Sequence, residues 1–243
     1  MTTRNTLINV LMLGALILYP PLARAGIGDF LRDVQKSLSG SELPESRVVQ
    51  GLKEALETGT ANAVKTVSKT GGYFDNSRIR IPLPGPVKKV EKVLQAVGYG
   101  PQVDAFERSM NLAAEQAAPH AKSLFWDAIK AMNFDDARRI LKGRENEATL
   151  YFEEKIRDRL TGLFKPLVHK TMADVGVTRQ YQALDAKVRS LPFTDALQFD
   201  LDKYVTDRGL DGLFLMLAEE ERKIRQDPAA RVTDLLKEVF GGK

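Results

Sequence analysis

Apolar residues recur at helical spacing along almost the whole chain, and this periodicity limits the fold more than any other feature. From Glu45 to about Lys69 they fall mostly at i, i+4 and i+7, and similar stripes cover residues 151–172 and 201–224. No fixed-period repeat divides the chain. We therefore predict an all-α fold, an irregular multi-helix bundle, in which residues 45–243 form a single helical domain.

One segment, near residues 78–86, breaks the helical pattern. Ile79, Ile81 and Leu83 alternate with polar residues or proline, and the prolines at 82, 84 and 86 forbid a continuous helix. The backbone polar groups of such an extended arm have three outlets. They can face water, pair in a short hairpin with a segment such as 197–201, or pack across helices in polyproline form.

We expect an ordered arm that lays its three apolar side chains on the helical body. Arg78 and Arg80 would then point outward or pair with acidic residues. The alternative is that the arm serves as an edge that binds a partner.

The N-terminus has the pattern of a secretory signal peptide. Arg4 is the positive n-region, residues 7–19 are almost wholly apolar, and Ala23 and Ala25 form an A-x-A cleavage site. An uncleaved anchor is the alternative, but this run is shorter than the roughly 20 residues of a membrane span. We expect export to the periplasm of a Gram-negative bacterium and cleavage after Ala25. A short helix and linker over residues 26–44 and no transmembrane span are then expected in the mature chain.

The composition excludes several classes of site. Cleavage would leave 243 − 25 = 218 residues with a net charge of (36 − 2) − 32 = +2. A nearly neutral chain without a block of five like charges gives no reason to expect nucleic-acid binding. The absence of cysteine excludes disulfides, thiolate metal sites and a lipid-modified N-terminal cysteine.

Residues with catalytic or metal-binding chemistry are sparse. His120 and His169 lack the carboxylate or histidine neighbours of a metal site, and the P-loop, dinucleotide and nucleophile-elbow motifs are missing. We therefore predict no metal, no cofactor and no catalytic residue. The acidic run at 219–221 is expected on a solvated helix face, where pairing is expected for Glu220 with Lys223 and for Glu221 with Arg225.

The segment Leu-Asp-Gly-Leu-Phe at 210–214 combines an acid with two nearby glycines. Gly209 and Gly212 indicate the close approach of another segment, because glycine destabilises a helix interior by about 1 kcal/mol relative to alanine. Asp211 stands on an otherwise apolar stripe, and a buried aspartate needs a cationic partner. We expect Asp211 to be a structural hub that joins the arm to the long helix, with a ligand site as the alternative. The candidate partners are Arg78, Arg80 and Arg231.

Two local signals concern helix boundaries. Pro119 lies inside an apolar pattern, which leaves either one kinked helix or two helices that meet at the proline. Asn133 is placed as the N-cap of a short helix through Leu141, with Asp135 and Asp136 in its first turn.

Five blocks of residues are similar to one protein family. They are GLKEAL at 51–56, IRIPLP at 79–84, MNLAAEQAAP at 110–119, YVTDRGLDGLF at 204–214 and IRQDPAAR at 224–231. On these blocks the chain resembles the bacterial domain of unknown function 4197 family, from about Val48 to Gly241. The resemblance implies an exported, mostly helical bacterial protein, and it brings no known activity. The family often has proline where Ser77 stands and alanine where Gly209 stands.

Two classes of function fit these observations. The first is a non-catalytic, envelope-associated module that binds a small apolar ligand or a protein partner, because small residues and prolines leave room between helices. A structural or assembly factor is not distinguished from it by the sequence. The second is an enzyme whose site is assembled from distant residues, with Tyr204, Asp211 and Arg225 as candidates. The candidate binding residues, which also fit a purely structural role, are Arg78, Arg80, Tyr204, Asp211, Arg225 and Arg231.

Overall fold

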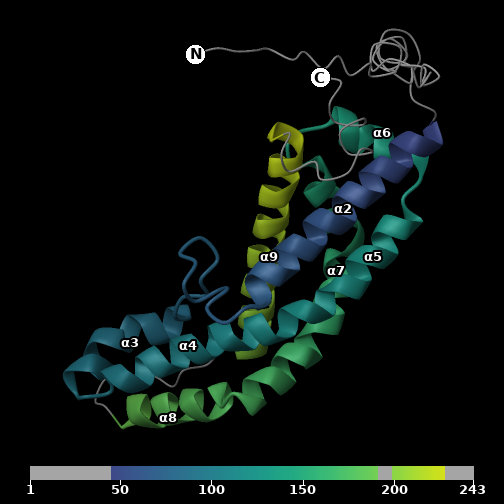
Figure 1. Cartoon of the computed structure of the whole chain (residues 1–243). Helices are drawn as coiled ribbons and strands as arrows, with labels where there is room; N and C mark the ends of the chain where they lie inside the picture. Colours follow the sequence, from purple (N-terminus) through teal and green to yellow (C-terminus); the bar gives the residue numbers. More distant parts are fainter. Residues whose placement is uncertain (1–44, 191–198, 228–243) are drawn as a thin grey trace, which may run out of the picture. The chain divides into compact units, whose positions relative to one another are not determined.

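The computed structural model describes residues 45–190 and 199–227, and this part of the chain is helical (Figure 1). The predicted all-α class is confirmed, because the described residues contain helices and turns but no strand. None of these helices is both long enough and apolar enough to cross a membrane. The elements are α2 (Glu45–Ser68), α3 (Gly85–Ala96), α4 (Gly100–Ala117), the 3₁₀ turn η1 (Ala118–Ala121), α5 (Lys122–Ala131), α6 (Phe134–Lys142), α7 (Glu147–Asp174), α8 (Val177–Arg189) and α9 (Leu201–Gln226).

The core forms where the longest helices meet. Helix α9 packs against both α2 and α7, and α5 lies against α2 and α7. Phe125 of α5 joins these layers, because its ring meets Phe152 of α7 edge-on at 5.3 Å and Phe214 of α9 at 5.7 Å. Such edge-to-face pairs stabilise a core by about 0.5–1.5 kcal/mol beyond the area that they bury.

Prolines act differently in two places. At Pro119 the chain forms two helices, α4 and α5, joined by the turn η1, which decides between the two predicted arrangements. Pro166 instead lies inside α7, which continues through it to Asp174. The predicted cap of α6 is confirmed: Asn133 Oδ1 accepts from Asp136 N at 2.9 Å, and Asp136 Oδ2 accepts from Asn133 N at 3.2 Å.

The arm at 78–86 is ordered against the helices, as predicted. Ile79, Ile81 and Leu83 are only 5%, 0% and 7% exposed. The arm forms no strand, and Pro84 has the polyproline angles of φ −58° and ψ 149° before α3 begins. The hairpin alternative involved a segment that lies partly outside the described residues, and its last residue, Leu201, begins α9.

Gly212 of α9 allows Tyr73 and Ile79 to approach closely, which confirms the expected approach of another segment. The Tyr73 hydroxyl donates a hydrogen bond to Gly209 O at 2.6 Å. A Cβ atom at Gly212 would stand 2.7 Å from Tyr73 Cε1 and 3.1 Å from Ile79 Cβ. A side chain at Gly212 would therefore displace the buried arm.

The two glycines provide a matched pair of substitutions. Gly212→Ala should destabilise the fold by about 1–3 kcal/mol, because the added methyl overpacks a closed contact. Gly209→Ala should be neutral or stabilising by up to about 1 kcal/mol, because its Cβ would lie at an ordinary 3.6 Å from Ala114 Cβ and alanine favours a helix. Urea unfolding of both variants measures the difference, and equal stabilities would contradict the packing of the arm.

Candidate functional site

Helix α4 presents three polar side chains to the arm. Glu107, Asn111 and Glu115 are four residues apart, so they lie along one face of the helix. Each of the three has a partner within residues 71–81. We call these three residues the α4 ladder, and the segment from 71 to 84 the strap.

The Asn111 carboxamide makes the pair of backbone hydrogen bonds that a neighbouring strand would otherwise make with Ile81. Its Oδ1 accepts a hydrogen bond from Ile81 N at 2.8 Å, and its Nδ2 donates one to Ile81 O at 2.8 Å. Both residues are buried, so water does not supply an alternative partner. An unsatisfied buried polar group costs about 1–3 kcal/mol. Asn111 is therefore the reason that an extended segment is stable in a helical protein.

Glu115 collects the N–H groups of the turn that follows α2. Oε1 accepts from Tyr73 N at 3.0 Å and from Phe74 N at 3.3 Å, while Oε2 accepts from Gly71 N at 3.2 Å. Gly71 has a φ of 76°, a left-handed conformation that glycine adopts without strain. Three donors converging on one buried carboxylate offset the cost of burying its charge.

Two tyrosines fix the strap to α9. Tyr73 donates to Gly209 O, and Tyr204 donates to Pro82 O at 3.0 Å. Burial, together with the carboxylates of Glu115 and Asp211, raises the pKa of Tyr73, so its hydroxyl remains a donor at neutral pH. Burial also raises the pKa of Tyr204.

The two arginines of the strap pair with acids, as predicted for one of their two arrangements. Arg78 forms an ion pair with Glu219 of α9. Arg80 Nε lies 2.9 Å from Glu107 Oε1 of α4. Each arginine thereby connects the strap to a different helix.

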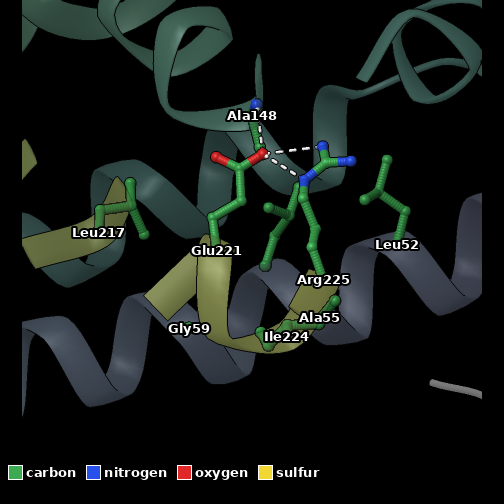
Figure 2. Close-up of a pocket in the computed structure, with 9 residues that line it drawn as sticks. Leu52, Ala55, Gly59, Ala148, Leu217, Glu221, Ile224 and Arg225 are labelled. Carbon is green, nitrogen blue, oxygen red and sulfur yellow. Dashed lines mark hydrogen bonds and ion pairs between the residues drawn. The ribbon is translucent and has the colours of Figure 1, made fainter. Parts of the chain in front are cut away.

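A second buried carboxylate, Glu221 of α9, holds the N-terminus of α7 (Figure 2). Its Oε1 accepts from Ala148 N at 2.9 Å. Its Oε2 accepts from Thr149 N at 3.0 Å and from the Thr149 hydroxyl at 3.0 Å. These N–H groups belong to the first turn of α7, where a helix leaves its donors unpaired and its dipole favours negative charge. Glu221 thus acts as an N-cap that another helix supplies.

Arg225 extends this connection to α6. Its Nη2 donates to Glu221 Oε1 at 2.8 Å and to Ile140 O near the end of α6 at 2.8 Å. The predicted pairing of Glu221 with Arg225 is confirmed. The pair therefore stands between a helix C-terminus and a helix N-terminus, and each charge faces the end of opposite polarity.

The prediction that the run 219–221 is solvated is wrong. Glu220 and Glu221 are buried, because α2 and α7 both close over this part of α9. Glu220 accepts from Asn62 of α2 at 3.1 Å and, as predicted, from Lys223 at 2.5 Å. A Cβ at Gly59 would be 3.6 Å from that of Glu220, so a small residue in α2 permits the close contact.

A small cavity adjoins the Glu221–Arg225 pair (Figure 2). It has a volume of about 20 Å³, and α2 and α9 supply most of its apolar wall. This is close to the space that one water molecule needs. The cavity is therefore too small for a lipid or another sizeable apolar ligand. Its apolar lining consists of Leu52, Ala55, Leu56, Gly59, Ala148, Leu217 and Ile224.

Asp211 is not the predicted link between the arm and α9. Its side chain is 48% exposed and pairs with Arg157 of α7. Arg157 also lies 3.4 Å from Glu153, one turn earlier in α7. The expected partners Arg78 and Arg80 pair elsewhere, and Arg231 lies outside the described residues. Successive residues of a helix point about 100° apart, so Gly212 faces the strap while Asp211 faces α7.

The three residues proposed for an assembled enzyme site do not converge. Asp211 lies seven residues from Tyr204 and fourteen from Arg225 on α9. At 1.5 Å per residue these separations correspond to about 10 Å and 21 Å. Each of the three side chains is already bonded to a different part of the protein.

The histidines are not part of a metal site in the described part of the chain. His169 Nδ1 lies 2.8 Å from Asp202 Oδ2, and His120 is exposed within η1. Within residues 45–190 and 199–227 no three histidine, aspartate or glutamate side chains are grouped as metal ligands.

An open groove lies between the first turn of the strap and α4. It has a volume of about 360 Å³, and Phe74 forms part of its wall. The guanidinium carbons of Arg80 and Arg108 lie 4.1 Å and 4.5 Å from the centre of that ring. Arg80 is paired with Glu107, but within the described residues Arg108 has no carboxylate partner. The other residues of this strap–α4 groove are Thr70, Gly71, Asp75, Ala105, Ser109, Leu112 and Glu115.

Comparison with known proteins places the chain in a family. The family described as "Protein of unknown function (DUF4197)" matches residues 42–241. The chain belongs to this family. The match includes the strap, the α4 ladder and the Glu221–Arg225 pair, so all the contacts described above lie within the family domain. Comparisons with curated proteins and with solved structures gave no match.

Asn111 and Asp211 offer a test of where the strap is held. Asn111→Leu should destabilise the protein by about 2–4 kcal/mol, because Ile81 N and Ile81 O both lose a buried partner. Asp211→Asn removes a half-exposed ion pair and should change stability by less than about 1 kcal/mol. The free energy of unfolding in urea decides the comparison, and a larger loss for Asp211→Asn would restore the hub hypothesis.

Proposed function

We propose that this member of the DUF4197 family is exported to the periplasm, is cleaved after Ala25, and acts there as a non-catalytic binding module. The proposed ligand is a segment of a partner protein, bound in the strap–α4 groove. The observation that carries the proposal is Arg108, an exposed guanidinium that lies over Phe74 without a carboxylate partner among the described residues.

The buried polar groups argue against chemistry as the main role. Asn111, Glu115 and Glu221 each satisfy backbone groups of another segment, and Arg225 does the same for α6. A general acid or base must be free to exchange a proton with a substrate. These groups are instead required to hold the chain together.

The size and charge of the groove favour a protein segment over a small apolar ligand. The small cavity beside Glu221 admits only about one water, whereas the strap–α4 groove is about 360 Å³ in volume. Phe74, Ala105 and Leu112 supply apolar wall, and Arg108 supplies a cation that suits a carboxylate. Asp75 also lines the groove, so the favoured segment carries one carboxylate beside an apolar side chain and not an acidic run.

Export is tested by the processing of the full chain in a Gram-negative cell. The product should appear in the periplasmic fraction with Gly26 as its first residue. Ala25→Pro should block cleavage and leave a longer, membrane-retained precursor, because signal peptidase needs a small residue at that position. N-terminal sequencing of the fractionated protein is the measurement, and an unprocessed cytosolic product would refute the export proposal.

Binding in the groove is tested by site-specific photo-cross-linking. A benzoylphenylalanine at Leu112, inside the groove, should give a defined adduct in the periplasm, and one at Lys170 on α7 should not. Arg108→Ala should lower the yield of the adduct about tenfold or more, because a charge-assisted hydrogen bond contributes about 1.5–3 kcal/mol to binding. Arg159→Ala is the matched control, since it removes an exposed arginine outside the groove. An adduct that is unaffected by Arg108→Ala would refute the proposed site.

A further inference from the structure

Helix α3 exposes apolar side chains on the side that faces away from α4. Among the described residues four large apolar side chains are exposed, and two of them, Val93 and Val97, belong to α3 and its C-cap. They are 44% and 42% exposed, and their spacing of four places them on one face. The opposite face is already used, because Val87 and Leu94 are buried where α3 packs on α4.

Lysines flank the exposed valines. Lys89 and Lys92 are exposed and form no ion pair in the described part of the chain, while Lys88 pairs with Glu91 at 2.7 Å. At 100° per residue, Lys89, Lys92, Val93 and Ala96 fall within about 100° of one another around the helix. Three lysines and one glutamate give α3 a net charge of 3 − 1 = +2.

The start of α4 and helix α8 add an aromatic ring and a further lysine next to α3. Tyr99, three residues after the end of α3, is the N-cap of α4 and is half-buried. The Nζ atom of Lys187 in α8 lies 5.3 Å from the centre of the Tyr99 ring. Figure 1 shows α3, the start of α4 and α8 close together. We call Lys89, Lys92, Val93, Ala96 and Val97 the α3 face.

We propose that the α3 face binds the surface of an anionic phospholipid bilayer. Helices that lie on membranes combine an apolar stripe, which enters the boundary of the acyl chains, with lysines that contact anionic headgroups. The α3 face has both an apolar stripe and lysines, and the opposite side of α3 packs on α4. This inference rests on the proposed export, because an exported chain meets the periplasmic surfaces of the envelope.

A second copy of the chain is a poorer occupant of this face. A symmetric contact would bring Lys89 and Lys92 of one molecule towards the same lysines of the other. Like charges placed together at an interface disfavour association. An anionic bilayer meets the same lysines with opposite charge.

Vesicle co-sedimentation tests the proposal on the processed chain that begins at Gly26, because the apolar leader would itself bind lipid. The probes are vesicles of phosphatidylglycerol mixed with phosphatidylcholine, and vesicles of phosphatidylcholine alone. The chain should bind the first kind and not the second, and salt should weaken the binding. Lys89→Glu with Lys92→Glu should lower the partition coefficient about tenfold or more. Val93→Ser with Val97→Ser should lower it without changing the charge.

Two controls separate this surface from the rest of the protein. Lys142→Glu with Lys170→Glu makes the same charge change on exposed positions of α6 and α7 and should retain vesicle binding. Arg108→Ala should also retain it, so the result is independent of the strap–α4 groove. Equal binding to both kinds of vesicle, equal losses in the α3 and control variants, or no binding at all would overturn the proposal. The face would instead be assigned to a second copy of the chain by a different result. In that case the chain would sediment as a dimer and not bind vesicles, and Val93→Ser with Val97→Ser would convert the dimer to a monomer.

Discussion

The hydrogen bonds between the Asn111 side chain and the Ile81 backbone are the constraint on which the rest of the structure depends. A non-helical segment inside a helical protein has buried N–H and C=O groups that no helix satisfies. Asn111 supplies one donor and one acceptor to the same residue, and Glu115 supplies acceptors to the turn before it. Because both side chains come from α4, the strap, α4 and α9 form one connected arrangement, in which Tyr73 and Tyr204 bond the strap to α9.

The same principle operates at the other end of α9. Glu221 satisfies the first turn of α7, and Arg225 satisfies a carbonyl of α6. In both regions a charged or amide side chain serves the backbone of a distant segment, and its own burial is tolerated because it is fully bonded. This use of polar residues leaves open surfaces, the strap–α4 groove and the α3 face, as the places where the protein meets other molecules.

The sequence predicted the elements better than their partners. Alternation of Ile79, Ile81 and Leu83 was sufficient to place the strap on the helical body, and two glycines were sufficient to predict a close approach. The choice of Asp211 as the hub was wrong because a helix turns by about 100° per residue, so Gly212 and its neighbour face different segments. Asn111, Glu115 and Arg108 were missed. The spacing of Glu107, Asn111 and Glu115 at four residues was a visible signal, but it does not show which distant backbone lies opposite.

The position of Pro82 next to Ile81 has a further consequence for the strap. If the segment slid by one residue toward its N-terminus, Pro82 would stand opposite Asn111, and it has no N–H to donate. The same slip would turn Arg80 inward, because side chains alternate along an extended chain. A one-residue slip in this direction would therefore lose the Asn111 hydrogen bond and bury a charge, so Pro82 and Arg80 together hold the segment in its alignment with α4.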